Sequence, residues 1–225
     1  MSGIIINPYS FATGSAFSST KSLNFDGIDD YVDLGSFTLN TDAAWSISLW
    51  TNLDDFSYLY PEVFVLKTDE ATGFTCFMGG ASSYTGINFG SNANFTTFKT
   101  TGDISGDLVG AWVNIILTYN GSGKTTSSNY TIYVDGALVA NTTTGAFAAT
   151  PNVSKIGVGQ GAYFDGKIDE VAIWNSELSA LNAVTIYNSG APGDLTSLSP
   201  QAWYRMGENS TFSSPQILMP ENTNK

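Results

Sequence analysis

The stretch KIGVGQGAYFDGKIDEVAIWNSELSALNAVTIYNSG, residues 155–190, carries the clearest fold signals in this 225-residue chain. Its first half contains two apolar runs of strand length, Lys155–Val158 and Lys167–Trp174, and the pair Asp165-Gly166 predicts a turn before the second run. Its second half predicts a short helix over Ala180–Tyr187, with a serine N-cap before it and glycine and proline after it. Strands followed by one short helix indicate an all-β domain rather than alternating βαβ units.

Strand signals recur along the rest of the chain, between clusters of glycine, asparagine, aspartate and serine. In Trp45–Thr51 large apolar residues alternate with serine, and Trp112–Tyr119 also alternates with the period of two that a β-strand has. Asp135-Gly136 between two alternating runs predicts a hairpin with a type I′ turn, because both central residues of that turn need positive φ. The other predicted strands are Lys21–Phe25, Tyr31–Leu34, Glu62–Lys67, Phe74–Met78, Thr85–Phe89, Asn94–Lys99, Tyr130–Val134, Ala137–Asn141 and Ala202–Met206.

The composition excludes several classes of partner. The net charge is −12 and histidine is absent, and a surface rich in carboxylates repels phosphate backbones, so we expect no nucleic-acid partner. No apolar stretch approaches the ~20 residues of a membrane-spanning helix, so we expect no membrane insertion.

The single cysteine, Cys76, excludes an intrachain disulfide. The N-terminal stretch MSGIIINPYSF lacks the basic start and long apolar run of a secretion signal, so we expect no leader.

Three stretches, taken in order, resemble the laminin G-like and pentraxin-related domains of the concanavalin A-like lectins and glucanases. They are SLNFDGIDDYVDLG with WSISLW at 22–50, AWVNIILTYNGS with YTIYVDGALVA at 111–140, and the stretch at 155–190. The resemblance implies an all-β fold in which two antiparallel sheets form a jelly-roll sandwich, with one short helix near the C-terminal end. We therefore divide the chain into an N-terminal arm (1–20), a laminin G-like sandwich (21–195), and a C-terminal strand and arm (196–225).

The resemblance also implies a structural calcium site. The turn after the first predicted strand contains Asp26, Gly27 and Asp29, where the family often places carboxylate and carbonyl ligands, and Ca²⁺ takes six to eight oxygens of these kinds. Asp169 lies on the closing strand, which in this fold runs near the first. We expect these four residues to form the metal site. The alternative is that the acidic residues only shape a turn, as Asp-Gly and Asp-Asp pairs often do.

Aromatic and amide side chains in the predicted loops suit a lectin-like site, where rings stack on sugars and amides bind hydroxyl groups. The candidates for ligand binding are Tyr58, Tyr60, Tyr84, Asn88, Gln160 and Tyr163. We expect their loops to rim one end of the sandwich. The alternative is that these aromatic residues plug the ends of the sandwich without binding a ligand.

Catalysis is not expected. Glucanases of this superfamily use two glutamates on one face of a strand, about 5 Å apart in a retaining mechanism. Asp169 and Glu170 are adjacent on a predicted strand, so their side chains should point to opposite faces and only one can line a cleft. Without histidine there is no Ser-His or Cys-His pair, and zinc lacks its usual ligands. The residues therefore favour a non-catalytic binding or structural module.

Related modules with the SLNFDGxDDYV stretch and an AWYRMGE segment, here Ala202–Glu208, resemble parts of tail, fibre and head-decoration proteins of marine bacteriophages. The resemblance implies a structural virion protein that assembles in the host cytoplasm, contacts other virion subunits or further copies of itself, and binds host-surface glycans. The alternative is a bacterial cell-surface or secreted, calcium-dependent lectin-like adhesin. A polysaccharide-degrading enzyme is the third hypothesis.

Overall fold

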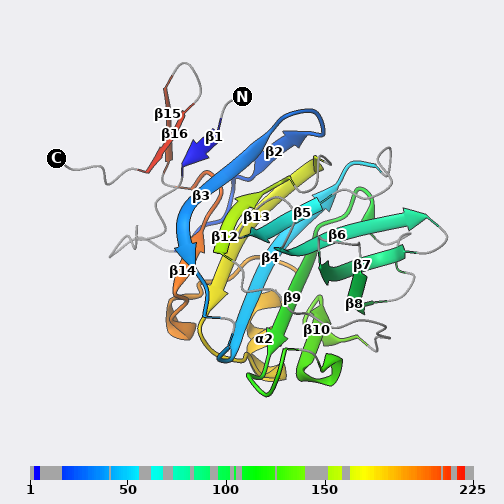
Figure 1. The fold of residues 1–225 in the computed structure, drawn as a ribbon. Helices are drawn as coiled ribbons and strands as arrows, with labels where there is room; N and C mark the ends of the chain where they lie inside the picture. Colours follow the sequence, from blue (N-terminus) through cyan, green and yellow to red (C-terminus); the bar gives the residue numbers. More distant parts are fainter. Residues whose placement is uncertain are drawn as a thin grey trace.

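The computed structural model describes residues 3–5, 17–40, 42–55, 62–67, 73–81, 84–91, 96–101, 104, 108–124, 126–139, 152–158, 163–208, 210–213 and 217–220. Most of the described strands form two sheets that pack face to face, with one α-helix against the second sheet (Figure 1). The predicted all-β, two-sheet jelly-roll sandwich is confirmed. Among the described residues, no helix is long and apolar enough to span a membrane.

The first sheet has seven described strands. Their spatial order is β1 (Gly3–Ile5), β3 (Tyr31–Thr38), β12 (Asn152–Ile156), β5 (Glu62–Lys67), β6 (Gly73–Ala81), β7 (Tyr84–Ser91) and β8 (Thr96–Thr100). The parallel pairing of β1 with β3 is the exception to the antiparallel pairing of the described strands. The edge strand β1 was not among the predicted strands.

The second sheet holds the strands that matter for the site. Their spatial order is β11 (Ala137–Leu138), β10 (Tyr130–Val134), β9 (Val113–Tyr119), β4 (Trp45–Leu53), β13 (Asp165–Trp174) and β14 (Ala202–Tyr204). The strand β2 (Leu23–Asp26) also pairs with β13. Outside the two sheets, β15 (Ser210–Ser213) and β16 (Ile217–Pro220) pair with each other, and η1 (Ser127–Asn129) and η2 (Thr196–Leu198) are 3₁₀ turns.

The core lies between the two sheets and is built by the predicted alternation. Trp45, Ile47 and Leu49 of β4 point into the main core, as do Val113, Ile115, Leu117 and Tyr119 of β9. The intervening Ile116 belongs to a second apolar cluster on the outer face of the same sheet. Because both faces of this sheet are covered, its central strands are buried along almost their whole length.

The helix α2 (Ala180–Tyr187) covers part of that outer face and has the predicted bounds. Ser179 caps it in a capping box with Asn182, which satisfies amide groups that the first turn leaves unpaired. Its buried residues Ala183 and Ile186 join the outer cluster. The predicted hairpin is also confirmed, since Asp135 and Gly136 have φ of 51° and 73°, the signs that a type I′ turn requires.

The turn predicted at Asp165-Gly166 is wrong. Both residues lie inside β13, where Asp165 pairs with Asp26 of β2, and Gly166 pairs with Phe25 of β2 and Leu53 of β4. The glycine is required by close packing and not by a chain reversal. A Cβ at this position would lie 2.2 Å from the carbonyl oxygen of Asn52, and the φ of Gly166 is +140°.

Candidate functional site

A β-bulge in β13 positions the two acidic residues that dominate the outer face of the second sheet. Asp169 pairs with Trp50 of β4, and Ala172 pairs with Ser48, so two residues of β13 stand opposite one of β4. Glu170 has a left-handed φ of 48°, which suits a bulge. Ile168 and Val171 on either side point into the main core.

The bulge corrects the expectation that the two carboxyl groups point to opposite faces. That expectation assumed an unbroken strand, and one extra residue restarts the alternation. Both groups instead reach the same outer face, where Asp169 accepts a hydrogen bond from the Ser19 hydroxyl at 2.8 Å and Glu170 also interacts with Ser19. Whether the two can act as a catalytic pair therefore depends on the surroundings of each carboxyl group.

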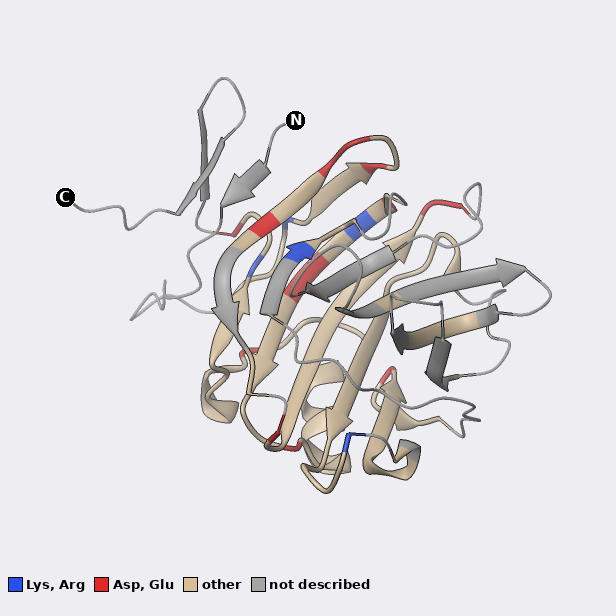
Figure 2. Cartoon of the chain, in the orientation of Figure 1, with Lys and Arg blue, Asp and Glu red and all other residues tan. Residues whose placement is uncertain are grey.

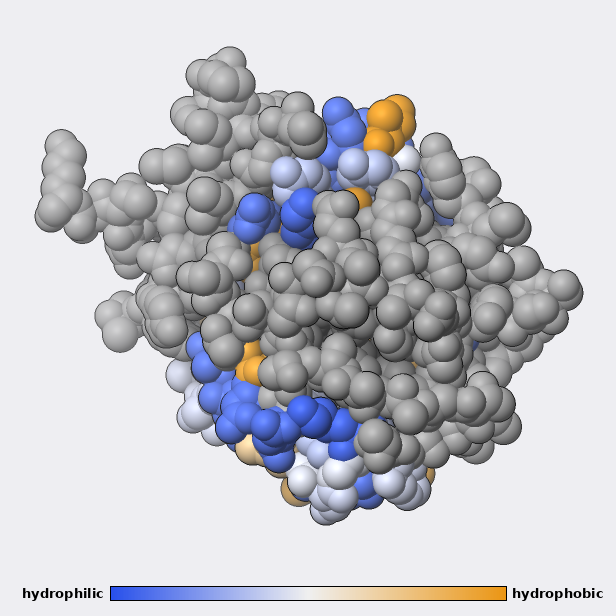
Figure 3. All heavy atoms as spheres, in the orientation of Figure 1, coloured by the Kyte–Doolittle hydropathy of each residue, from blue (hydrophilic) through white to orange (hydrophobic). Residues whose placement is uncertain are grey.

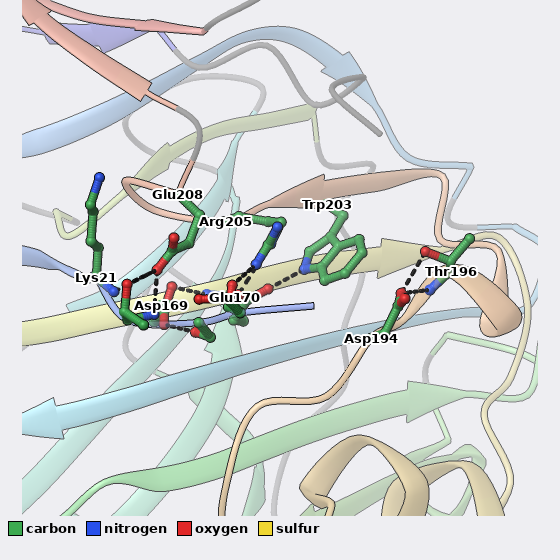
Figure 4. Close-up of polar contacts among 11 residues, drawn as sticks. Lys21, Asp169, Glu170, Asp194, Thr196, Trp203, Arg205 and Glu208 are labelled. Carbon is green, nitrogen blue, oxygen red and sulfur yellow. Dashed lines mark hydrogen bonds and ion pairs between the residues drawn. The ribbon is translucent and has the colours of Figure 1, made fainter. Parts of the chain in front are cut away.

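The bulge lies at a seam along one edge of β13. Residues 165–168 pair with β2, and residues 171–173 pair with β14, so neither strand pairs with Asp169 or Glu170. Residues 17–22 before β2 and residues 205–208 after β14 contact each other and the acidic pair at this point (Figure 4). Segments from the two ends of the chain therefore meet at the acidic pair.

The carboxylate of Glu170 accepts hydrogen bonds from two donors, one in β14 and one directly after it. The indole of Trp203 and the Nε of Arg205, the latter at 3.3 Å, both donate to its carboxylate (Figure 4). Burial raises the pKa of Glu170, while the Arg205 guanidinium and the Trp203 hydrogen bond oppose that rise. Of the two carboxyl groups, Glu170 is therefore the one with a cationic partner.

Asp169 has no such cation among the residues that the structure describes. It is 5% exposed, and burial together with the charge of Glu170 raises its pKa to about 8, despite the hydrogen bonds from Ser19 and the Glu170 amide. The desolvation of a carboxylate favours its neutral form. Asp169 is therefore mostly protonated at neutral pH and can then donate as well as accept a hydrogen bond.

A pocket of about 350 Å³ opens beside Asp169 on this face. Its lining residues are Ser19, Thr20, Lys21, Ser22, Trp50, Trp112, Lys167, Asp169, Gly190, Ala191 and Pro192. Trp112 is 39% exposed and presents an aromatic surface, whereas Trp50 is buried and stacks on Tyr187 of α2 at 5.9 Å between ring centroids. The pocket thus combines an indole surface with hydroxyl, ammonium and carboxyl groups, the mixture that polar small-molecule sites use.

The acidic turn between β2 and β3 forms a separate candidate site. The carboxylate oxygens of Asp26, Asp29 and Asp30 lie within 4.8 Å of one another, and Figure 2 shows this acidic group at one end of the molecule. Asp26 accepts hydrogen bonds from the amides of Ile28 (2.9 Å) and Asp29 (3.4 Å). The pKa of Asp30 is raised by burial and then by the neighbouring charge of Asp26, a repulsion that a bound cation would relieve.

A backbone hydrogen bond ties the acidic turn to the start of β13. Gly27 has a φ of +72° and its amide donates to the Phe164 carbonyl at 3.1 Å, which ties the turn to the residue before β13. Ile28 is highly exposed, and Figure 3 shows hydrophobic surface at this end of the molecule. The three carboxylates of the turn supply hard oxygen donors of the kind that Ca²⁺ takes.

The register does not bring Asp169 to this turn. Asp26 pairs with Asp165, and Asp169 lies four residues further along β13, roughly 13 Å at the rise of a strand. Asp165 instead neighbours the turn, and its pKa is raised by burial and by the charges of Asp55, Asp54 and Asp26. The four predicted metal ligands therefore fall into two places, with Asp26, Gly27 and Asp29 in one and Asp169 in the other.

The comparison with protein families decides the identity of the fold. A laminin G family model, described as the concanavalin A-like lectin/glucanases superfamily, matches residues 26–183. The chain belongs to this superfamily. No curated protein is significantly similar to it in sequence.

Solved structures that align with a TM-score of 0.50 or more share the fold at low sequence identity. A Bacteroides ovatus protein named for carbohydrate binding aligns with a TM-score of 0.56 and 16% identity, covering 86% of this chain and 54% of that one. Domain 4 of AbnA, a GH43 extracellular arabinanase from Geobacillus stearothermophilus solved with arabinotriose, aligns with a TM-score of 0.50 and 18% identity, covering 69% of each chain. A SAP-like pentraxin from Limulus polyphemus aligns with a TM-score of 0.46 and 15% identity, over 75% of this chain and 82% of that one.

Of the residues predicted to bind a ligand, Asn88 and Tyr163 have described side chains, and neither lines the pocket. Tyr58, Tyr60 and Gln160 lie outside the described residues. Tyr84 begins β7, and Tyr163 is half-buried and forms a backbone bridge with Val158. Asn88 is buried in β7, where its amide group donates to the Gly86 carbonyl at 3.1 Å, so it does not rim an open end of the sandwich.

The pocket was not predicted from the sequence because its described lining comes from five separate segments of the chain. Trp112 falls on the more polar side of its strand, and a large aromatic residue on a polar face is a signal that the sequence contains. Ser19, Lys21 and Ser22 adjoin or lie in the predicted N-terminal arm, and nothing in the sequence indicates that this segment reaches Asp169. Their contribution depends on the seam between β2 and β14.

Proposed function

We propose that this protein is a non-catalytic glycan-binding module whose binding site is the pocket beside Asp169. The observation that carries the proposal is the pocket itself, which places the exposed indole of Trp112 among hydroxyl groups, two lysines and the carboxyl group of Asp169. Sugars present an apolar face and a ring of hydroxyl groups. An aromatic surface beside convergent donors and acceptors matches both features. Carbohydrate binding by structural neighbours agrees with the proposal but does not carry it.

The surroundings of the carboxyl groups support the absence of catalysis. Among the described residues that line the pocket, only Asp169 has a carboxyl group. Glu170 is turned to Trp203 and Arg205, whereas a glycosidase needs two carboxyl groups that flank the scissile bond. Assays for new reducing ends on laminarin, agar and alginate test this point. Turnover by the wild-type protein that Asp169→Asn abolishes would overturn it.

Trp112→Ala should weaken glycan binding about tenfold or more, since it removes an apolar stacking surface. The measurement is binding of the labelled protein to a glycan panel, followed by calorimetric titration of the best ligand. Leu138→Ala is the matched control, because Leu138 is an exposed apolar residue outside the pocket. Full affinity in the Trp112→Ala variant would refute the pocket as the binding site, and so would equal losses in both variants.

The setting that we propose for the module is a bacteriophage virion, where it would act as a decorating, fibre or tail component that contacts host-surface glycans. The support is the resemblance of the stretch at 22–50 and of AWYRMGE at 202–208 to such proteins. The test is light scattering of the purified chain with assays of its binding to virions and host cells. A monomer that binds neither virions nor host cells would count against this setting.

A calcium-dependent adhesin is the alternative that the acidic turn favours. If Ca²⁺ binds the cluster of Asp26, Asp29 and Asp30, millimolar calcium should raise the thermal midpoint relative to EDTA by several degrees, because binding to the native state alone stabilises it. Asp26→Asn should abolish this shift, whereas Asp169→Asn should leave it intact since Asp169 lies elsewhere. An unchanged thermal midpoint in calcium would refute calcium binding by this turn.

A further inference from the structure

The AWYRMGE segment, Ala202–Glu208, begins as β14 and then turns against residues 17–22. Its first set of contacts with residues 17–22 is made by aromatic rings and by a guanidinium group. Phe17 stacks on Trp203, with ring centroids 6.0 Å apart and planes 12° apart, and the Arg205 guanidinium lies 4.7 Å from the Phe17 ring centroid. The Nη2 of Arg205 also donates to the Ser18 carbonyl. Arg205 therefore joins the N-terminal segment to Glu170 of the bulge.

Glu208 makes the second set of contacts with residues 17–22. One oxygen of its carboxylate accepts from the Thr20 amide, from the Thr20 hydroxyl at 3.1 Å and from the Lys21 amide at 2.6 Å (Figure 4). Hydrogen bonds to an ionised acceptor are about twice as strong as neutral ones. A single side chain thus satisfies two consecutive backbone amides that lie outside the described strands.

The turn that places Glu208 against residues 17–22 is tight. Met206 and Gly207 have φ of 37° and 123°, and the Glu208 amide donates to the Arg205 carbonyl at 3.0 Å. A Cβ on Gly207 would lie 3.3 Å from the Cβ of Lys21, so the turn rests directly against residues 17–22. The sequence RMGE therefore supplies a cation, a reversal and an anion at the spacing that this contact needs.

The segment held in this way forms one wall of the pocket. Ser19, Thr20, Lys21 and Ser22 line the pocket, whereas Arg205 and Glu208 do not. We propose that Ala202–Glu208 is a clamp that positions residues 17–22 as a wall of the pocket. Arg205 and Glu208 are accordingly positioning residues, and docking of this wall is coupled to ligand binding. The identity of the ligand as a glycan rests on the proposed function, but the clamp does not.

The coupling has a thermodynamic consequence. A ligand that contacts the wall binds the docked state better than the undocked state, so it must stabilise docking by the same factor by which docking improves its affinity. Loss of the clamp should therefore weaken binding although no contact to the ligand is removed. Saturating ligand should in turn slow the exchange of the wall amides.

The experiment compares Glu208→Ala and Glu208→Gln with wild type by hydrogen–deuterium exchange of the full chain without ligand. Exchange of the Thr20 and Lys21 amides should accelerate about a hundredfold in Glu208→Ala and about tenfold in Glu208→Gln, because the glutamine retains a neutral acceptor. Asp194→Asn is the matched control. Asp194 also accepts from an amide and a hydroxyl, both of Thr196, and these hydrogen bonds do not involve residues 17–22. It should leave exchange at residues 17–22 unchanged.

A second readout, fluorescence quenching by acrylamide, follows the pocket itself. Trp112 is the most exposed of the five tryptophans, so it dominates the quenching, and an undocked wall should raise the quenching constant in Glu208→Ala about twofold. Binding of the best glycan, measured well below the thermal midpoint of each protein, should weaken about tenfold in that variant. If the Thr20 and Lys21 amides exchange at the wild-type rate in both Glu208 variants, the proposed clamp is wrong. Faster exchange with unchanged quenching would overturn its role in the pocket. A wild-type protein that binds no glycan would refute the proposed function while these two readouts still decide the clamp.

Discussion

Asp169→Asn should stabilise the protein by several kcal/mol at pH 9 and have little effect at pH 4. The pKa of Asp169 is raised from 3.8 to about 8 by burial and by Glu170. The folded state therefore keeps a proton that the unfolded chain releases near pH 4. Stability is fully present below that pH and is lost as the pH rises to about 8. At 1.36 kcal/mol for each pKa unit, the rise from 3.8 to about 8 corresponds to a loss of about 6 kcal/mol.

Urea unfolding at pH 5, 7 and 9 measures this effect. Asparagine has nearly the shape of aspartic acid, and it can accept from the Glu170 amide while donating to the Ser19 hydroxyl, so the variant should keep its stability as the pH rises. Some pH dependence should remain, because burial also raises the pKa of Asp30, Asp135 and Asp165. Asp194→Asn is the control, since hydrogen bonds from Thr196 lower the pKa of that carboxyl group and confine its influence to acid. Parallel stability curves for wild type and Asp169→Asn would contradict the buried position of Asp169.

Gly166→Ala should destabilise the protein by about 3 to 5 kcal/mol or prevent folding, combining overpacking with strain at a positive φ. Three backbone atoms lie close to where the new Cβ would be, namely the Asn52 oxygen at 2.2 Å and, at 3.0 Å, the Asp54 nitrogen and the Leu53 Cα. Backbone cannot rotate away as a side chain can. The substitution must therefore separate β13 from β4 at their junction with β2.

Gly110→Ala is the control for Gly166→Ala. Gly110 has a φ of +74° and open space where a Cβ would stand, so it reports the strain of positive φ alone, about 1 to 2 kcal/mol. Denaturant midpoints of the two variants give the difference. Equal destabilisation would show that β13 and β4 do not pack closely at Gly166.

Several features of the fold follow from local sequence patterns. The inward faces of β4 and β9, the hairpin at Asp135-Gly136 and the helix α2 were all predicted, and each depends on neighbours within a few residues. Side-chain alternation, a turn that needs positive φ, and a capping serine are local properties. The amino-acid sequence alone was therefore sufficient for the fold class and for most elements.

The candidate site depends on contacts that local patterns do not contain. The bulge that turns Asp169 and Glu170 to one face lies where β13 pairs with β4 on one edge and passes from β2 to β14 on the other. The register of β13 on β2 separates Asp169 from the acidic turn. The pocket forms where residues 17–22 meet Asp169, 150 positions apart for Ser19.

The sequence by itself thus determined that this protein is a lectin-like β-sandwich with a turn rich in carboxylates. Only the tertiary structure decided which carboxyl group is buried, which one is paired with Arg205, and which segments form the pocket. The physical reason is that strand periodicity is set by the geometry of a single backbone, whereas register, bulges and pKa values are set by the partners that the fold brings to it.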